Sequence, residues 1–197
     1  MTERPSARET ADRALILYAL IRRAAIEVIV TDGDDLMRRR QAENARQETE
    51  HWLERESLTG ALTPTERALF DAPTAAWTRE AIADGLWRKE ALGVLLWALR
   101  LVEAMPAIDA EFVVEDLNTA IEGAGSVSSF RSAARLRDPS EIEVVWREAD
   151  TWFGATEGAT DEDHTLASIS AERSRALGGG GPPPPPPPPP PGRRGRR

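Results

Sequence analysis

The chain has 197 residues, a net charge of −8 and no cysteine, and 41% of its residues are hydrophobic. This length suits one domain with appendages, and the missing cysteine excludes disulfides, thiolate nucleophiles and cysteine-based zinc sites. The acidic balance differs from the basic patch of a nucleic-acid-binding protein, so no nucleic-acid partner is expected. The sequence also lacks the apolar run of a signal peptide or a membrane span. We therefore expect no membrane association and a cytoplasmic location.

The first predicted element is a long amphipathic helix. Ser6 and Glu9 have the spacing of a capping box, which marks a helix start. Apolar side chains then recur at helical spacing, at Ala11, Ala14, Leu15, Tyr18, Ile21, Ala25, Val28 and Ile29. Residues 36–53 form a second, highly charged helix. We expect it to be a solvated outer helix, with a partner-binding face as the alternative.

The middle of the chain predicts a short helix and then the core helix. Thr63, Pro64 and Glu66 form a strong start signal, and Pro73 ends that short helix. A segment at 75–83 follows, kinked or separated from the next at Gly85. Residues 87–105 have an apolar arc too broad for a surface helix, which predicts a helix packed on several sides, ended by Pro106.

Two charged residues interrupt this apolar arc. Arg88 and Glu90 project from it near its first turn. Because an unpaired buried charge costs several kcal/mol, each needs a partner. The pattern fits a structural ion-pair network, and it also fits a polar pocket used for binding.

Further helices are predicted over residues 111–121, 130–136 and 166–177. Another begins at Asp138 and Pro139 and carries an apolar stripe of Ile142, Val145, Trp146, Ala149, Trp152 and Phe153. No stretch alternates apolar and polar residues for long enough to predict a strand. The fold class is therefore all-α, a single-domain bundle of roughly seven helices with a disordered C-terminal tail.

The composition changes abruptly at Gly178, which divides the chain into a helical domain (1–177) and a low-complexity tail (178–197). The tail begins with four glycines, continues with ten consecutive prolines and ends with two glycines and four arginines. It is interpreted as a disordered appendage, as a polyproline ligand for a proline-recognising domain, or as a reading-frame accident. Its basic end can also contact the acidic body through weak, salt-dependent attraction.

Known catalytic and metal-binding patterns are weak in this sequence. Glu48 and His51 form a Glu-x-x-His pair, and Asp161 and His164 have the same offset. In a chain with 33 acidic residues this offset is a common coincidence, so no metal is expected. No glycine-rich phosphate loop or nucleophile elbow is present. We therefore expect no cofactor and no identifiable catalytic residues.

The order of several short motifs resembles a bacterial family catalogued as domain of unknown function 4272. The resemblance is carried by Glu66-Arg67, Trp87-Arg88, Glu90-Ala91, Leu95 to Leu99, Leu136-Arg137, Glu141-Ile142, Ala149-Asp150, Glu172-Arg173 and Ala176-Leu177. It covers most of residues 11–177 and implies no activity. The chain departs from the family pattern after Asp150, where Arg and His-Trp would be expected. It departs again after Leu177, where the glycine-proline segment begins.

Two functional hypotheses follow. The first is a non-catalytic cytoplasmic helical domain that binds an unknown protein partner. The second is a small-ligand-binding protein or enzyme that uses a polar pocket around Arg88 and Glu90. The candidate binding residues are Arg67, Arg88, Glu90, Arg137, Glu141 and Asp150. The same six side chains suit a structural charge network equally well.

Overall fold

The computed structural model describes residues 5–31, 35–155 and 163–177. All regular structure in these ranges is helical, which confirms the predicted all-α class. The elements are α1 (Ala7–Thr31), α2 (Leu36–Arg55), the 3-10 helix η1 (Thr59–Ala61), α3 (Pro64–Asp71), α4 (Arg79–Ala98), α5 (Val114–Glu122), α6 (Val127–Ala133), α7 (Pro139–Ala155) and α8 (Asp163–Leu177). No helix in the described part of the chain is long and apolar enough to cross a membrane. The predicted tail lies outside the described residues.

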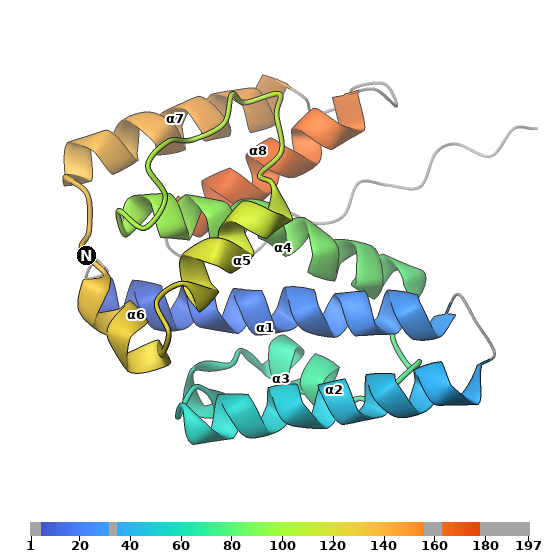
Figure 1. The fold of residues 1–197 in the computed structure, drawn as a ribbon. Helices are drawn as coiled ribbons and strands as arrows, with labels where there is room; N and C mark the ends of the chain where they lie inside the picture. The colour runs from blue at the N-terminus through green and yellow to red at the C-terminus, as the bar shows by residue number, and fades with distance from the viewer. Residues whose placement is uncertain (1–4, 32–34, 156–162, 178–197) are drawn as a thin grey trace, which may run out of the picture.

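The helices stack in layers around a central pair (Figure 1). α1 and α4 lie side by side through the middle of the molecule. α2 packs against α1 on one side, α8 packs against α4 on the other, and α7 covers α8. The short helices α5 and α6 contact α4 and α1, respectively. The core is therefore shared by α1 and α4 and does not centre on α4 alone.

α1 is buried on all sides over its middle, where every residue from 14 to 21 is buried. Its last turns differ from the predicted stripe, since Ala25 and Ile29 are exposed. Ile26 and Val30 are buried there and pack with Ala42 of α2. The buried face rotates because α2 covers this end of α1.

α4 is continuous from Arg79 and is not broken at Gly85. Thr78 caps its start by accepting a hydrogen bond from the Ala81 N–H. A Cβ at position 85 would lie 2.8 Å from the Cβ of Ala24. The glycine therefore permits close approach of α1 and α4.

The predicted end of the core helix at Pro106 is wrong, because α4 ends at Ala98. Arg100 has φ 60 and lies in the left-handed region. Its N–H donates to the carbonyl of Trp97, and the Leu101 N–H donates to that of Leu96, each at 2.9 Å. These are the two hydrogen bonds of a Schellman motif, which here forms without glycine. Residues 99–113 consequently form a long connection to α5.

Candidate functional site

Glu90 is sealed inside the protein between α4 and α8. Its carboxylate accepts from the Phe112 N–H at 2.9 Å, and from Nε and Nη2 of Arg173 at 3.0 and 2.9 Å. Arg173 in turn donates to the carbonyl of Ala110 at 2.7 Å. Both side chains are almost fully buried, at 0% and 2% exposure. The pair therefore fixes the chain segment that connects α4 to α5.

Arg88 lies two residues before Glu90 on α4 and forms a second, more open ion pair. Its Nη1 is 3.0 Å from Glu172 of α8, and the two side chains are 29% and 11% exposed. Two neighbouring ion pairs therefore join α4 to α8. Arg88 pairs with Glu172, and Glu90 pairs with Arg173. The partners on α8 were not among the predicted site residues. The sequence signal that could have identified them is the adjacent pair of opposite charges at Glu172 and Arg173, which complements Arg88 and Glu90.

The other predicted site residues lie elsewhere, so the six do not form one cluster. Arg137 donates to the carbonyl of Trp97 at 2.7 Å and lies 4.7 Å from the centre of the Trp97 ring. It also contacts Glu141 at 3.3 Å, which places these two at the C-terminal end of α4. Asp150 accepts from Ser174 of α8, and Arg67 donates to a backbone carbonyl near η1.

A second buried ion pair was not predicted from the sequence. Arg23 and Glu27 on α1 are both 0% exposed and bond to each other. Arg23 donates to the carbonyl of Ala72 at 3.0 Å, and Glu27 accepts from the Trp77 N–H at 3.3 Å. This pair fixes the α3–α4 connection, as Glu90 and Arg173 fix the α4–α5 connection. In both, backbone groups bond to the charged side chains, although Nε of Arg23 has no hydrogen-bond partner among the described residues. Such enclosure by backbone groups is the geometry of structural ion pairs.

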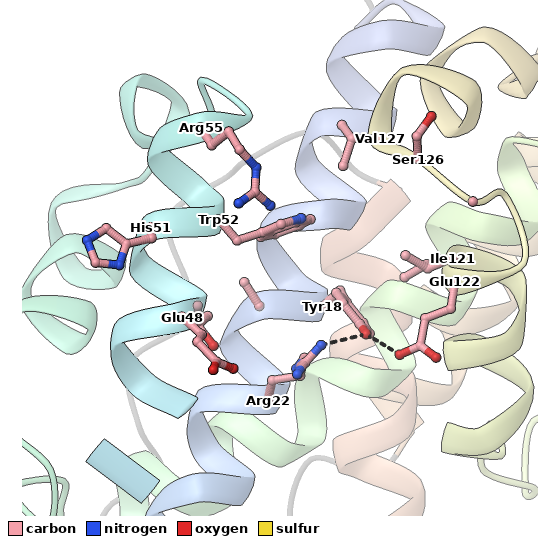
Figure 2. A pocket seen from close by; sticks show the side chains of 13 residues that line it. Tyr18, Arg22, Glu48, His51, Trp52, Arg55, Ile121, Glu122, Ser126 and Val127 are labelled. Carbon is pink, nitrogen blue, oxygen red and sulfur yellow. Dashed lines mark hydrogen bonds between the residues drawn. The ribbon is translucent and has the colours of Figure 1, made fainter. Parts of the chain in front are cut away.

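An open hollow lies between α1, α2, α5 and the start of α6 (Figure 2). Its volume is about 600 Å³. Figure 2 shows Tyr18 and Arg22 on α1, Trp52 and Arg55 reaching from α2, and Glu122 on α5. Glu48 and His51 of α2 also line it, with apolar side chains from α5 and α6. We call this the Tyr18 hollow.

Tyr18 is at the centre of the polar contacts in this hollow. Its hydroxyl donates to Glu122 at 2.6 Å and accepts from Nη1 of Arg22 at 3.1 Å. Its ring packs edge-to-face against Trp52, with centroids 6.3 Å apart. Burial, together with the hydrogen bond to Glu122, raises the pKa of the Tyr18 hydroxyl above its ordinary value. The hydroxyl is therefore a protonated donor at neutral pH.

Metal ligands do not gather in the part of the chain that the structure describes, where no group of three or more His, Asp or Glu forms a metal site. Glu48 and His51 both line the Tyr18 hollow. The second predicted motif includes Asp161, which lies outside the described residues.

The comparison with protein families matches this chain to a known family. The model of the family described as domain of unknown function (DUF4272) matches residues 2–176. The chain belongs to this family. The match to DUF4272 therefore includes all the helices except the last residue of α8, and it ends before the glycine-proline segment. Searches of curated proteins and of solved structures found no match. The family assignment thus adds no activity to the DUF4272 domain.

Proposed function

We propose that this DUF4272 domain is a cytoplasmic, non-catalytic binding module, and that the Tyr18 hollow receives a segment of a protein partner. The hydrogen-bonded chain Arg22–Tyr18–Glu122 carries the proposal. It joins two helices in an open hollow, whereas the two buried ion pairs are enclosed by backbone groups. Recognition sites place fixed polar groups beside apolar surface, and this hydrogen-bonded chain lies beside Trp52, Ile121 and Val127 in the same hollow.

The lining of the hollow indicates the chemistry of the segment it would bind. Arg22 and Arg55 supply positive charge, and Glu48 and Glu122 supply negative charge. Between them, Trp52 offers an aromatic surface of the kind enriched at interaction hot spots. A peptide with an aromatic or apolar side chain between charged groups of both signs fits this arrangement.

A peptide library panned against the full chain tests the proposal. Enriched peptides should bind the wild type at least about tenfold more tightly than Tyr18→Phe or Glu122→Gln, as measured by calorimetry, because each variant removes a charge-assisted hydrogen bond. Glu115→Gln is the matched control, since Glu115 is an exposed carboxylate on the same helix outside the hollow. Equal binding by wild type and both hollow variants, or failure to enrich any peptide, would reject the proposal.

The alternative small-ligand site around Arg88 and Glu90 has weaker support. The Glu90 carboxylate already accepts three hydrogen bonds at full burial. A ligand there would have to displace Arg173 from a nearly buried position. We therefore place binding in the Tyr18 hollow.

A further inference from the structure

A second hollow lies where α7 begins and α8 ends. Its volume is about 510 Å³. Its wall is mainly apolar and includes Leu136, Pro139, Ile142 and Trp146, together with Leu177 at the end of α8. We call it the Trp146 hollow. Neither buried ion pair lines it, and it shares no residue with the Tyr18 hollow.

The chain itself continues from the edge of this hollow. Leu177 lines it and is the last residue of α8. Four glycines follow, then ten prolines at 182–191, then four arginines in the last five residues. A glycine run is conformationally permissive and allows the chain to reverse direction. The prolines are therefore tethered next to an apolar hollow that contains an aromatic ring.

The Trp146 hollow with α7 and the C-terminal segment at 178–197 have complementary chemistry. Proline-rich segments bind to aromatic-lined apolar grooves, because their stiff backbone loses little entropy on docking. α7 carries four acidic residues and one basic residue, whereas the C-terminal segment carries four arginines and no acid. Lengths also agree, since ten prolines span about 31 Å and the 17 residues of α7 span about 26 Å. The arginines would then reach the C-terminal end of α7, which the helix dipole makes favourable for cations.

We propose that residues 178–197 fold back onto their own domain, with the prolines in the Trp146 hollow and the arginines near the end of α7. The glycine-proline segment is then an intramolecular ligand of the domain. Because the segment is tethered to the domain, its effective concentration at the hollow is high, and weak contacts suffice for it to bind there.

Paramagnetic relaxation measured by NMR on the full chain tests this arrangement. The chain has no cysteine, so Gly192→Cys gives one site for a nitroxide label. The proposal predicts selective broadening of the amide signals of Asp150 and Thr151, near the end of α7. The indole signal of Trp52 on α2, at the opposite side of the layers, should stay sharp (Figure 1). High salt should weaken the effect.

Variants and mixing experiments identify what occupies the hollow. Trp146→Ala should abolish the broadening, whereas Val144→Ala should retain it, since Val144 is 67% exposed on the same helix and outside the hollow. Absent or uniform broadening in the otherwise unaltered chain would overturn the proposal without any need for the Trp146 variant to fold. Broadening seen only between labelled and unlabelled copies would overturn it in favour of docking on a second copy.

Discussion

Replacing Glu90 with alanine leaves the Arg173 guanidinium charged in a site where its side chain is 2% exposed. The Phe112 N–H and Nε of Arg173 also lose their acceptor, and Nη2 of Arg173 keeps only the carbonyl of Ala110. Removing one member of a buried ion pair typically costs about 3–5 kcal/mol. For a domain of this size, the melting temperature should fall by about 6–20 °C.

Urea unfolding of the wild type, Glu90→Ala, Arg173→Met and the double variant measures this effect. The losses of unfolding free energy in the two single variants should sum to at least about 1.5 kcal/mol more than the loss in the double variant. Glu90→Ala leaves Arg173 as an unpaired buried charge and Arg173→Met leaves Glu90 as one, whereas the double variant removes both charges. Lys89→Ala is the neighbouring control. Its ion pair with Glu111 is partly exposed and should contribute under about 1 kcal/mol. A loss below about 1 kcal/mol for Glu90→Ala, or additive single variants, would refute the structural role of the pair.

Three further predictions concern other parts of the fold. Gly93→Ala should destabilise by about 1–3 kcal/mol, because its Cβ would lie 2.4 Å from the Phe112 ring. Gly60→Ala, with no atom within 4 Å, should change thermal stability by under about 0.5 kcal/mol, and equal effects would contradict the packing argument. Arg100→Gly should raise the unfolding free energy by a few tenths to about 1 kcal/mol, since glycine adopts the left-handed conformation without strain; a lower denaturation midpoint would count against this. The hydrogen bonds from Arg46 and Thr74 lower the pKa of Glu43 from 4.5 to about 2. The contribution of the Glu43 carboxylate to folding stability is therefore complete above pH 4.5 and is lost as the pH falls towards 2. This contribution is about 1 kcal/mol or less, because the side chain is 38% exposed. Thermal melts should then show a shallower acid dependence for Glu43→Gln, and parallel profiles would disprove the assignment.

Helix starts were predictable where the stabilising groups are neighbours in the sequence. Ser6 and Glu9 form the predicted capping box, with bonds of 2.8 and 3.2 Å. Thr63 and Glu66 form another at the start of α3. These bonds span three residues, so the sequence contains the whole interaction.

The end of α4 was not predictable by the same reasoning. Glycine is the usual signal for a left-handed helix end, and Arg100 occupies that position here. Leu101 and Val102 continue the apolar pattern although they lie beyond the helix, because the reversed chain still packs on the core. Apolar periodicity therefore extended the predicted helix by about two turns.

The candidate sites were also predictable only in part. Glu90 was recognisable because a charge in an apolar arc needs a partner, but Arg173 follows 83 residues later. Tyr18 was assigned to an apolar stripe, which its ring fits, and periodicity carries no information about its hydroxyl. The hollow exists only because α1, α2 and α5 converge on that hydroxyl (Figure 2), and this convergence is a property of tertiary structure.

The two buried ion pairs also affect how the molecule opens. The segments at 72–77 and 106–112 are loops, and loops usually fluctuate more readily than helices. Here Arg23 and Glu27 bond to the backbone of the first, and Glu90 and Arg173 to that of the second. Opening either loop would expose an ion pair from the centre of the fold, at a free energy close to that of global unfolding. The amides of Trp77 and Phe112 should thus exchange hydrogen as slowly as those of the core helices, so that these two connections unfold with the core.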